Sequence, residues 1–215
     1  MSVLRVLDWS RTAVVLPVVL VVASCSGGDA RPDGSSASHE DDDACPADMV
    51  VIPSLNVCID RYEASQGEGG KAESVFGVMP WANVSWYSAR DACIAAEKRL
   101  CDESEWFDAC SGPAPGTVYP YGDTYDPQAC NGDEHGVNAA VPTGSMTTCE
   151  GGYPGVFDMS GNLWEWTSTC GRVRGGAFFN RELVIDYLRC RYRADRVPVD
   201  DVDGDTIGFR CCVSR

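Results

Sequence analysis

Two carboxylates bracket a short glycine-bearing turn in the segment FDMSGNLWEWTS, residues 157–168. Asp158 precedes the turn, Gly161 lies within it, and Glu165 follows it. The backbone carbonyls of such a turn can converge, and a hard cation such as Ca²⁺ is bound by carboxylate and carbonyl oxygens together. The segment therefore indicates a calcium site. The alternative is that Asp158 and Glu165 only cap the turn and face water.

The segment RVRGGAFFN, residues 172–180, is a second candidate for chemistry. It combines two arginines, a Gly-Gly pair, two aromatic residues and an amide. It could form the floor of an active site, or it could be a core strand that leaves a tight turn. No cysteine lies between Cys170 and Cys190, so this stretch supplies no thiol.

Other side chains could support catalysis or binding, but each set has a simpler explanation. His39 and His135 are isolated, and no GxSxG segment accompanies them. Five tryptophans could stack on sugars, although such residues more often form core. Three arginines could line a groove for an anionic ligand or pair with the many carboxylates. The tryptophans are Trp81, Trp86, Trp106, Trp164 and Trp166, and the arginines are Arg189, Arg191 and Arg193.

The N-terminal residues predict export and lipid attachment. Residues 1–24 contain two arginines followed by an apolar run that is too short for a membrane-spanning helix. The run ends in VASC, which resembles a bacterial lipobox and makes Cys25 the expected lipidated residue; the alternative is secretory cleavage near Ala23. Residues 25–44 then form an acidic Gly/Ser tether. We expect a chain anchored to the membrane by its N-terminal lipid, at the bacterial cell envelope and at its outer membrane.

Composition restricts the remaining residues, 45–215, to one exported domain. The formal net charge of −15 gives no electrostatic footprint for nucleic acid, so we expect no nucleic-acid partner. Twelve cysteines in an exported chain indicate disulfide bonds, because the paired CxxC spacing of zinc ribbons is absent. With Cys25 set aside eleven remain, so we expect at least one thiol to be free or to pair between molecules.

Short helices and strands are expected, separated by long loops. Ser85 is placed to cap a helix whose apolar residues continue at helical spacing to Leu100. Asp102, with an acidic residue three positions later, starts a second short helix. Residues 162–167 and 187–193 alternate as strands, with Glu165 on the face opposite the two tryptophans. The combination predicts an irregular α+β domain.

Several fragments together resemble the formylglycine-generating enzyme, or sulfatase-modifying factor, family. The resemblance covers about Cys58 to the C-terminus and implies a C-type-lectin-like fold with little regular secondary structure. It is carried by the order of SWYSARDAC, KRLCDESEWFDAC, YPYGD, FDMSGNLWEWTS, VRGGAF and GFRC along the chain.

The resemblance also implies disulfide pairings. Family members with cysteines at corresponding positions imply two bonds, and the inward phase of Cys190 supports the second of them. Two more bonds are expected, and the last three cysteines would form one bond and leave one spare. The implied bonds are Cys93–Cys211 and Cys110–Cys190, the further expected ones are Cys45–Cys58 and Cys101–Cys212, and the remaining cysteines are Cys130, Cys149 and Cys170.

The activity of the family is oxidation of a substrate cysteine to formylglycine with copper(I) held by two thiolates. The matching positions here are Asn180 and Ile185, so copper is not expected. The family's calcium site maps onto Asp158, Gly161, Leu163 and Glu165. Asn131 matches the first ligand of a second calcium site, but its partner aspartate would fall near His135 and the connecting loop is shorter.

Three functions are therefore compatible with the sequence. The first is a non-catalytic, calcium-stabilised binding or structural module at the cell envelope. The second is an active oxidoreductase of the sulfatase-modifying factor type, or another enzyme that uses the same groove. The third is a receptor for a carbohydrate or an envelope protein.

Overall fold

A computed structural model describes residues 45–182, 186–200 and 205–215 of the chain. The predictions for the leader, the tether, Cys25, His39 and Ile185 lie outside these residues. Within the described ranges, no helix has both the length and the apolar character needed to cross a membrane.

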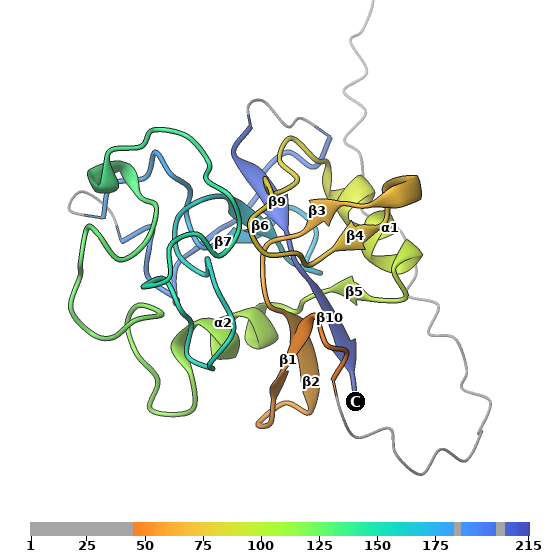
Figure 1. Ribbon diagram of the computed structural model, residues 1–215, viewed down its shortest axis with the longest axis horizontal. Helices are drawn as coiled ribbons and strands as arrows, with labels where there is room; N and C mark the ends of the chain where they lie inside the picture. The colour runs from red at the N-terminus through yellow and green to blue at the C-terminus, as the bar shows by residue number, and fades with distance from the viewer. Residues whose placement is uncertain (1–44, 183–185, 201–204) are drawn as a thin grey trace, which may run out of the picture. The chain divides into compact units, whose positions relative to one another are not determined.

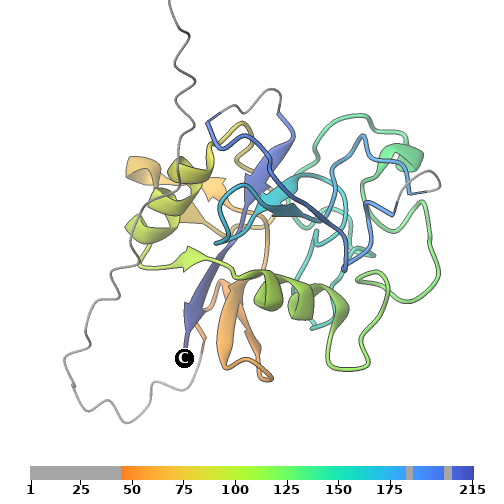
Figure 2. The ribbon, with the colours of Figure 1, turned by 180° about the vertical axis from the view of Figure 1, so that it is seen from behind.

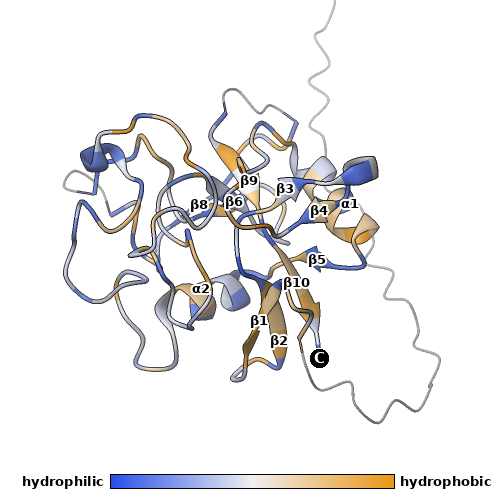
Figure 3. Ribbon diagram, viewed as in Figure 1, coloured by the Kyte–Doolittle hydropathy of each residue, from blue (hydrophilic) through white to orange (hydrophobic). Residues whose placement is uncertain are grey.

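One four-stranded sheet joins the two ends of the described domain. Its strand order is β1 (Met49–Ile52), β2 (Val57–Asp60), β10 (Cys211–Ser214) and β5 (Arg99–Leu100), and every neighbouring pair is antiparallel. β2 is buried along its whole length, and β1, β2 and β10 are mostly hydrophobic (Figures 1 and 3). The C-terminal strand is therefore an internal strand of this sheet.

The second four-stranded sheet carries the WEW segment. Its strands run in the order β8 (Arg193–Ala194), β7 (Val173–Arg174), β6 (Trp164–Trp166) and β9 (Ile207–Phe209). β6 and β9 are parallel, whereas the other pairs are antiparallel. β9 leads directly into β10, so only Arg210 separates the two sheets along the C-terminal segment (Figure 1).

The first helix, α1 (Trp86–Ala95), starts as predicted and ends earlier. The Ser85 hydroxyl accepts a hydrogen bond from the Ser88 backbone N–H at 3.1 Å. Glu97 then adopts a left-handed φ of 60°, which ends the helical conformation. The expectation that Leu100 continues the helix is wrong, because Leu100 lies in β5 and pairs there with Cys211 of β10.

The second helix, α2 (Glu103–Ser111), begins with the expected capping box. The Glu105 carboxylate accepts a hydrogen bond from the Asp102 backbone N–H at 2.7 Å. Figure 2 shows the two helices, coloured yellow-green and green, joined by the extended segment that contains β5. The smaller elements are the hairpin β3 (Ser65–Gln66) and β4 (Ala72–Glu73) and the 3₁₀ turns Glu68–Gly70 and Asp133–His135.

The arginine-rich segment 187–193 is not the continuous strand that its alternation predicted. Only its last residue, Arg193, belongs to a strand, β8, and the residues before it form turns. The expected inward and outward phase nevertheless holds, because Leu188 and Cys190 are buried whereas Arg191 is exposed. Period-two burial here comes from consecutive turns, which sequence alternation does not distinguish from a strand.

Disulfide bonds connect the sheets, helices and loops. The four bonds expected from the sequence are present, and Cys130 pairs with Cys149. Cys170 is also disulfide-bonded, so the expectation of a spare thiol among the last three cysteines is wrong, and none of the described cysteines is free. The four expected bonds are Cys45–Cys58, Cys93–Cys211, Cys101–Cys212 and Cys110–Cys190, and the fifth is Cys130–Cys149.

The tryptophans are part of the core. Trp106 and Trp166 are fully buried, and Trp86 and Trp164 retain less than a tenth of their exposed surface. Trp81 is partly buried and packs against Phe209 with ring centroids 5.7 Å apart. These burials leave no row of exposed indole faces, so the sugar-stacking platform is not formed by these residues.

Candidate functional site

The WEW strand places Glu165 inside the protein. All three residues of β6 are buried, and Glu165 lies opposite Arg174 of β7 and Gly208 of β9. Sheet partners on both edges and side-chain packing on both faces exclude water from this position. Glu165 therefore does not cap a solvent-facing turn.

Protein donors hold the Glu165 carboxylate in place. Arg210 donates from Nε to Oε2 and from Nη2 to Oε1, each at 2.7 Å, and Trp106 Nε1 donates to Oε2 at 2.7 Å. A carboxylate has about four lone-pair sites, so three are used and one remains on Oε1. The main partner of Glu165 is thus Arg210, and one acceptor site on the carboxylate is left for a cation.

The turn before β6 has left-handed backbone at three of its residues. Asp158 has a φ of 62°, Gly161 a φ of 75° and Asn162 a φ of 59°. A Cβ on Gly161 would lie 2.3 Å from the Asn131 carbonyl oxygen, so only glycine fits there. Asp158 Oδ2 accepts a hydrogen bond from the Gly144 N–H at 2.6 Å, and the Leu163 N–H donates to Glu63 Oε1 at 3.0 Å.

Negative charge exceeds positive charge in this region of the core. Glu63, Asp158 and Glu165 are buried, and the Arg210 guanidinium interacts with all three. Burial, and next the charge of Asp158, raises the pKa of Glu63 well above its usual range. Burial also raises the pKa of Asp158 to about 6. Such a region favours an added cation or a proton.

Asn131 lies against the same turn and has an unused acceptor. Its Nδ2 donates to the Ala139 carbonyl at 2.9 Å and to Asn162 Oδ1 at 3.0 Å. Among the described residues, its buried Oδ1 has no hydrogen-bond partner, and neither does His135 Nδ1. A buried oxygen without a donor costs free energy unless a cation or water satisfies it, so Asn131 fits a cation ligand.

The Gly-Gly segment forms a tight turn after β7. Gly175 and Gly176 have φ values of 91° and 73°, and a Cβ on Gly176 would lie 2.7 Å from Leu188 Cδ2. Asn180 is buried beyond this turn, and its Oδ1 accepts a hydrogen bond from the Ala177 N–H at 2.7 Å. Asn180 and Ile185 match the family's two thiol positions, and the structure describes only Asn180. At that position an amide therefore closes a turn.

The arginines of residues 189–193 pair with carboxylates, as the simpler explanation predicted. Arg189 Nε contacts Glu182 at 2.8 Å, and Arg191 Nη2 contacts Asp186 at 3.2 Å. Arg193 contacts the described acidic residues at longer distances, 3.8 Å from Glu103 and 3.5 Å from Asp195.

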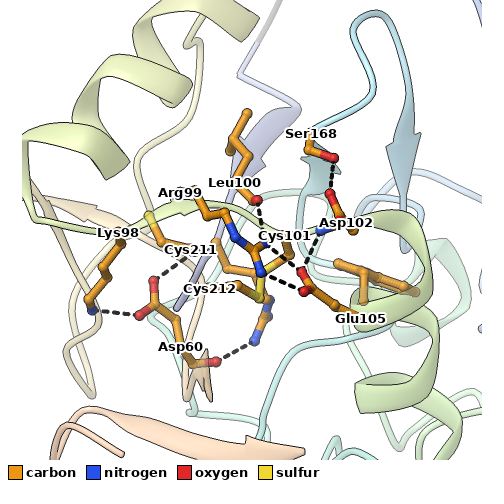
Figure 4. The surroundings of a disulfide bond; sticks show 12 residues. Asp60, Lys98, Arg99, Leu100, Cys101, Asp102, Glu105, Ser168, Cys211 and Cys212 are labelled. Carbon is orange, nitrogen blue, oxygen red and sulfur yellow. Dashed lines mark hydrogen bonds and ion pairs between the residues drawn. A yellow bond between two sulfur atoms is a disulfide. The ribbon is translucent and has the colours of Figure 1, made fainter. Parts of the chain in front are cut away.

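One group of potential metal donors was not foreseen from the sequence. Cys101, Glu105 and Cys212 have ligand atoms within 4.8 Å of one another. The two sulfurs are bonded to each other, and Glu105 pairs with Arg99 at 2.6 Å (Figure 4). Copper(I) requires free thiolates, so this group, like the Gly-Gly segment, does not fit a copper site.

Sequence reasoning missed the residues that hold the site together. Arg210 and Glu63 are both fully buried, yet neither belongs to a periodic pattern that would mark it. The available signal was the position of Arg210, a lone cation between the apolar runs IGF and CCV. A cation in that position needs a buried anion, and Glu165 supplies it.

Comparison with known proteins agrees with this architecture. The sequence profile of the sulfatase-modifying factor enzyme 1-like domain matches residues 38–215. "Inactive C-alpha-formylglycine-generating enzyme 2" of Bos taurus is 30% identical over 169 residues, which cover 70% of this chain and 54% of that protein. "Formylglycine-generating enzyme" of Mus musculus is 28% identical over 170 residues, covering 63% of this chain and 44% of that protein. The chain thus spans about half the length of these relatives.

Solved structures agree on the fold. The "Major Tropism Determinant I1 Variant" superposes with a TM-score of 0.54 at 15% sequence identity, over 79% of this chain and 53% of that chain. At this identity the likeness concerns the fold alone. The few short helices, the mixed sheets and the disulfide bonds make an irregular α+β domain of the C-type-lectin-like type. By its domain match, the chain belongs to the sulfatase-modifying factor, or formylglycine-generating enzyme, family.

Proposed function

We propose that the chain is a non-catalytic member of its family, a calcium-stabilised binding or structural module. The observation that carries this proposal is the state of Asn180. It stands at the first thiol position of the family's copper pair, it is buried, and its side chain closes a turn through Ala177. The described cysteines are all disulfide-bonded, which supports the absence of a substitute thiolate pair.

The names of the relatives support the same proposal without deciding it. Two of the matched mammalian proteins are named inactive, and others are named formylglycine-generating enzyme. The decisive experiment incubates the purified protein with copper(I), O₂ and a sulfatase-type cysteine peptide, with an active family member as the positive control. Mass spectrometry is expected to show an unmodified peptide. Formylglycine formed in proportion to the protein would replace this proposal with the oxidoreductase alternative.

Calcium is the second part of the proposal. Three buried carboxylates face one guanidinium, Asn131 Oδ1 lacks a donor, and Glu165 Oε1 keeps one free acceptor site. We place the cation beside the turn, with Asp158, Glu165 and the carbonyls of Gly161 and Leu163 as the ligand set. Asn131 adds an oxygen there or at a neighbouring second site. Hard oxygen donors of this kind suit Ca²⁺.

Metal analysis of the purified domain tests calcium and copper together. We expect calcium in stoichiometric amount and no copper. Removal of calcium with a chelator should lower the melting temperature, and added Ca²⁺ should restore it. A melting temperature that is the same in chelator and in excess Ca²⁺ would rule out a stabilising calcium site.

Attachment through Cys25 is the third part. Residues 22–25 read VASC, and the sequence from Cys25 to residue 44 suits a flexible tether of a lipid-anchored envelope protein. Metabolic labelling with a fatty acid should mark the wild-type chain in a bacterial host and leave Cys25→Ser unlabelled. Equal labelling of the two would exclude acylation at this residue.

The binding role has a candidate face beside the hairpin β3–β4. A hollow of about 480 Å³ is lined by three polar residues and by six apolar ones that include Met79 and Trp81, and Phe76, next to the lining residue Val75, is exposed. An envelope protein or a glycan would suit such a mixed lining. Capture from envelope extracts and a glycan array should both weaken with Phe76→Ser relative to Val137→Ser, an exposed apolar residue elsewhere. Equal capture by the two variants would exclude this face.

A further inference from the structure

Three arginines gather where β7, labelled in Figure 1, pairs with β8, labelled in Figure 3. Arg174 of β7 lies directly opposite Arg193 of β8 in the antiparallel register. Arg172 lies two residues before Arg174. It shares one carboxylate, Glu103, with both arginines, and a second, Asp195, with Arg193. Like charges directly opposite each other on neighbouring strands are destabilising. This arrangement needs negative charge nearby.

Two carboxylates supply part of that charge. Glu103, the first residue of α2, bonds Arg172 and lies 3.3 Å from Arg174 Nη2 and 3.8 Å from Arg193 Nη1. Asp195 lies 2.9 Å from Arg172 Nε and 3.5 Å from Arg193 Nε. Three guanidinium groups thus share two carboxylates, in a chain whose formal net charge is −15.

Donors of the cluster remain without full partners. Within the part of the chain that the structure describes, the buried Nε of Arg174 has no hydrogen-bond partner, although the side chain is only 8% exposed. Both ion pairs of Arg193 are longer than the 2.7–2.9 Å of an ordinary charge-assisted hydrogen bond. The exposed Arg193 guanidinium therefore keeps donors that an acceptor group from outside the chain can reach.

The cluster is open on one side. The side chains of Arg172 and Arg193 are 34% and 48% exposed, so a solute reaches them directly. Arg174 is buried, with its guanidinium 5.7 Å from the ring centre of Trp106, and shares Glu103 with the other two. Two partly exposed guanidinium groups and a buried third one thus gather around one carboxylate.

We propose that Arg172, Arg174 and Arg193 bind a tetrahedral oxyanion, phosphate or sulfate, either free or as a monoester group. Planar guanidinium forks match the paired oxygens of such anions, and a doubly charged anion offsets the local excess of positive charge. The net negative charge of the whole chain repels anions at long range. Binding therefore depends on these short-range contacts and not on general attraction. The site is independent of the calcium proposal and of the presence or absence of catalysis.

Calorimetric titration of the purified chain with sodium phosphate and with sodium sulfate tests the proposal, with ionic strength held constant by sodium chloride. We expect saturable binding of at least one of the two anions and a matching rise in melting temperature. Arg193→Gln and Arg172→Gln should each weaken binding about tenfold or more, as expected for a lost charged hydrogen bond.

Arg191→Gln is the matched control. Arg191 lies two residues from Arg193, its side chain is 69% exposed, and it pairs with Asp186 alone. Its replacement should leave anion binding within twofold of the wild type. No saturable binding of either anion would overturn the proposal, and so would equal weakening by Arg191→Gln and Arg193→Gln. Phenyl phosphate that binds as tightly as phosphate would assign the site to monoesters, and much weaker binding would assign it to the free ion.

Discussion

Arg210 and Glu165 form a buried ion pair that joins the two sheets. Both side chains are at most 1% exposed, and the two hydrogen bonds between them measure 2.7 Å. Glu165 lies at the centre of β6, and Arg210 is the residue between β9 and β10. Arg210 also donates to the carbonyls of Asp60 and Phe157. One guanidinium thus connects the WEW strand, the last residue of β2 in the first sheet and the residue before the turn.

Removal of either partner of this pair should strongly destabilise the domain. Arg210→Met leaves Glu165 buried without its main counter-charge, and we expect the free energy of unfolding to fall by about 3–5 kcal/mol. Urea unfolding measures the loss, and Arg90→Met serves as control because Arg90 forms an exposed pair with Asp91 that contributes about 0–1 kcal/mol.

The double variant Arg210→Met/Glu165→Leu distinguishes the pair from mere packing at these positions. It removes both charges, so its loss should be smaller than the sum of the two single losses. Additive losses would mean that the two side chains act independently.

The two helix starts and four disulfide bonds could be anticipated because each depends on local chemistry or on a family pattern. Ser85, Asp102 and Glu105 satisfy backbone N–H groups a few residues away, and such bonds need no tertiary information. The end of α1 could not be anticipated. Leu100 leaves the helical pattern because β10, more than a hundred residues later, pairs with it.

The sequence predicts which residue types form the candidate site, but not which other residues they contact. Asp158 and Glu165 were identified as a pair of carboxylates, whereas burial, Arg210 and Trp106 decide what Glu165 does. The sequence places Arg193 in an alternating run and Arg172 and Arg174 in the segment RVRGGAFFN. They join each other and Glu103 only through the β7–β8 register and the position of α2. Contacts of this kind depend on the fold and leave no local signal.

The calcium proposal predicts opposite effects of Asp158→Asn with and without metal. Asparagine tolerates the left-handed backbone of this residue and can still accept the hydrogen bond from Gly144. In chelator the variant should be at least as stable as the wild type, because it removes a buried charge.

In excess Ca²⁺ the same variant should lose most of the thermal stabilisation that the wild type gains, since a charged ligand is missing. Parallel melting curves in chelator and in Ca²⁺ provide the measurement. Asp126→Asn, at an exposed loop, is the control. A full calcium response in Asp158→Asn would remove this residue from the ligand set.

Asp60 should make the domain more stable as the solution becomes mildly acidic. Burial raises the pKa of Asp60 from 3.8 to about 6, although Lys98, 2.7 Å away, acts in the opposite direction. A group whose pKa is raised on folding contributes stability that is complete below its unfolded pKa and is lost as pH rises through the folded one. Between pH 7 and pH 5 the contribution should grow by about 1 kcal/mol.

Asp60→Asn isolates this contribution from those of other carboxyl groups. The variant cannot titrate, and it keeps an acceptor for the Cys211 N–H, which donates to Asp60 at 2.8 Å. The difference between wild type and variant in the free energy of unfolding, measured with urea at pH 7 and pH 5, should shift by about 1 kcal/mol in favour of the wild type at pH 5. A difference that is constant with pH would show that Asp60 keeps an ordinary pKa in the folded protein.

Asn180 should matter for stability and not for chemistry. Its Oδ1 accepts the hydrogen bond of the buried Ala177 N–H, so Asn180→Ala leaves that donor unsatisfied and should cost about 1–3 kcal/mol. Asn180→Asp keeps the acceptor and is the matched comparison; it should retain more stability than the alanine variant despite its burial. Urea unfolding measures both, and the peptide oxidation assay should give no product with wild type or variant. Asn180→Ala that unfolds like the wild type would show that the turn does not depend on this amide.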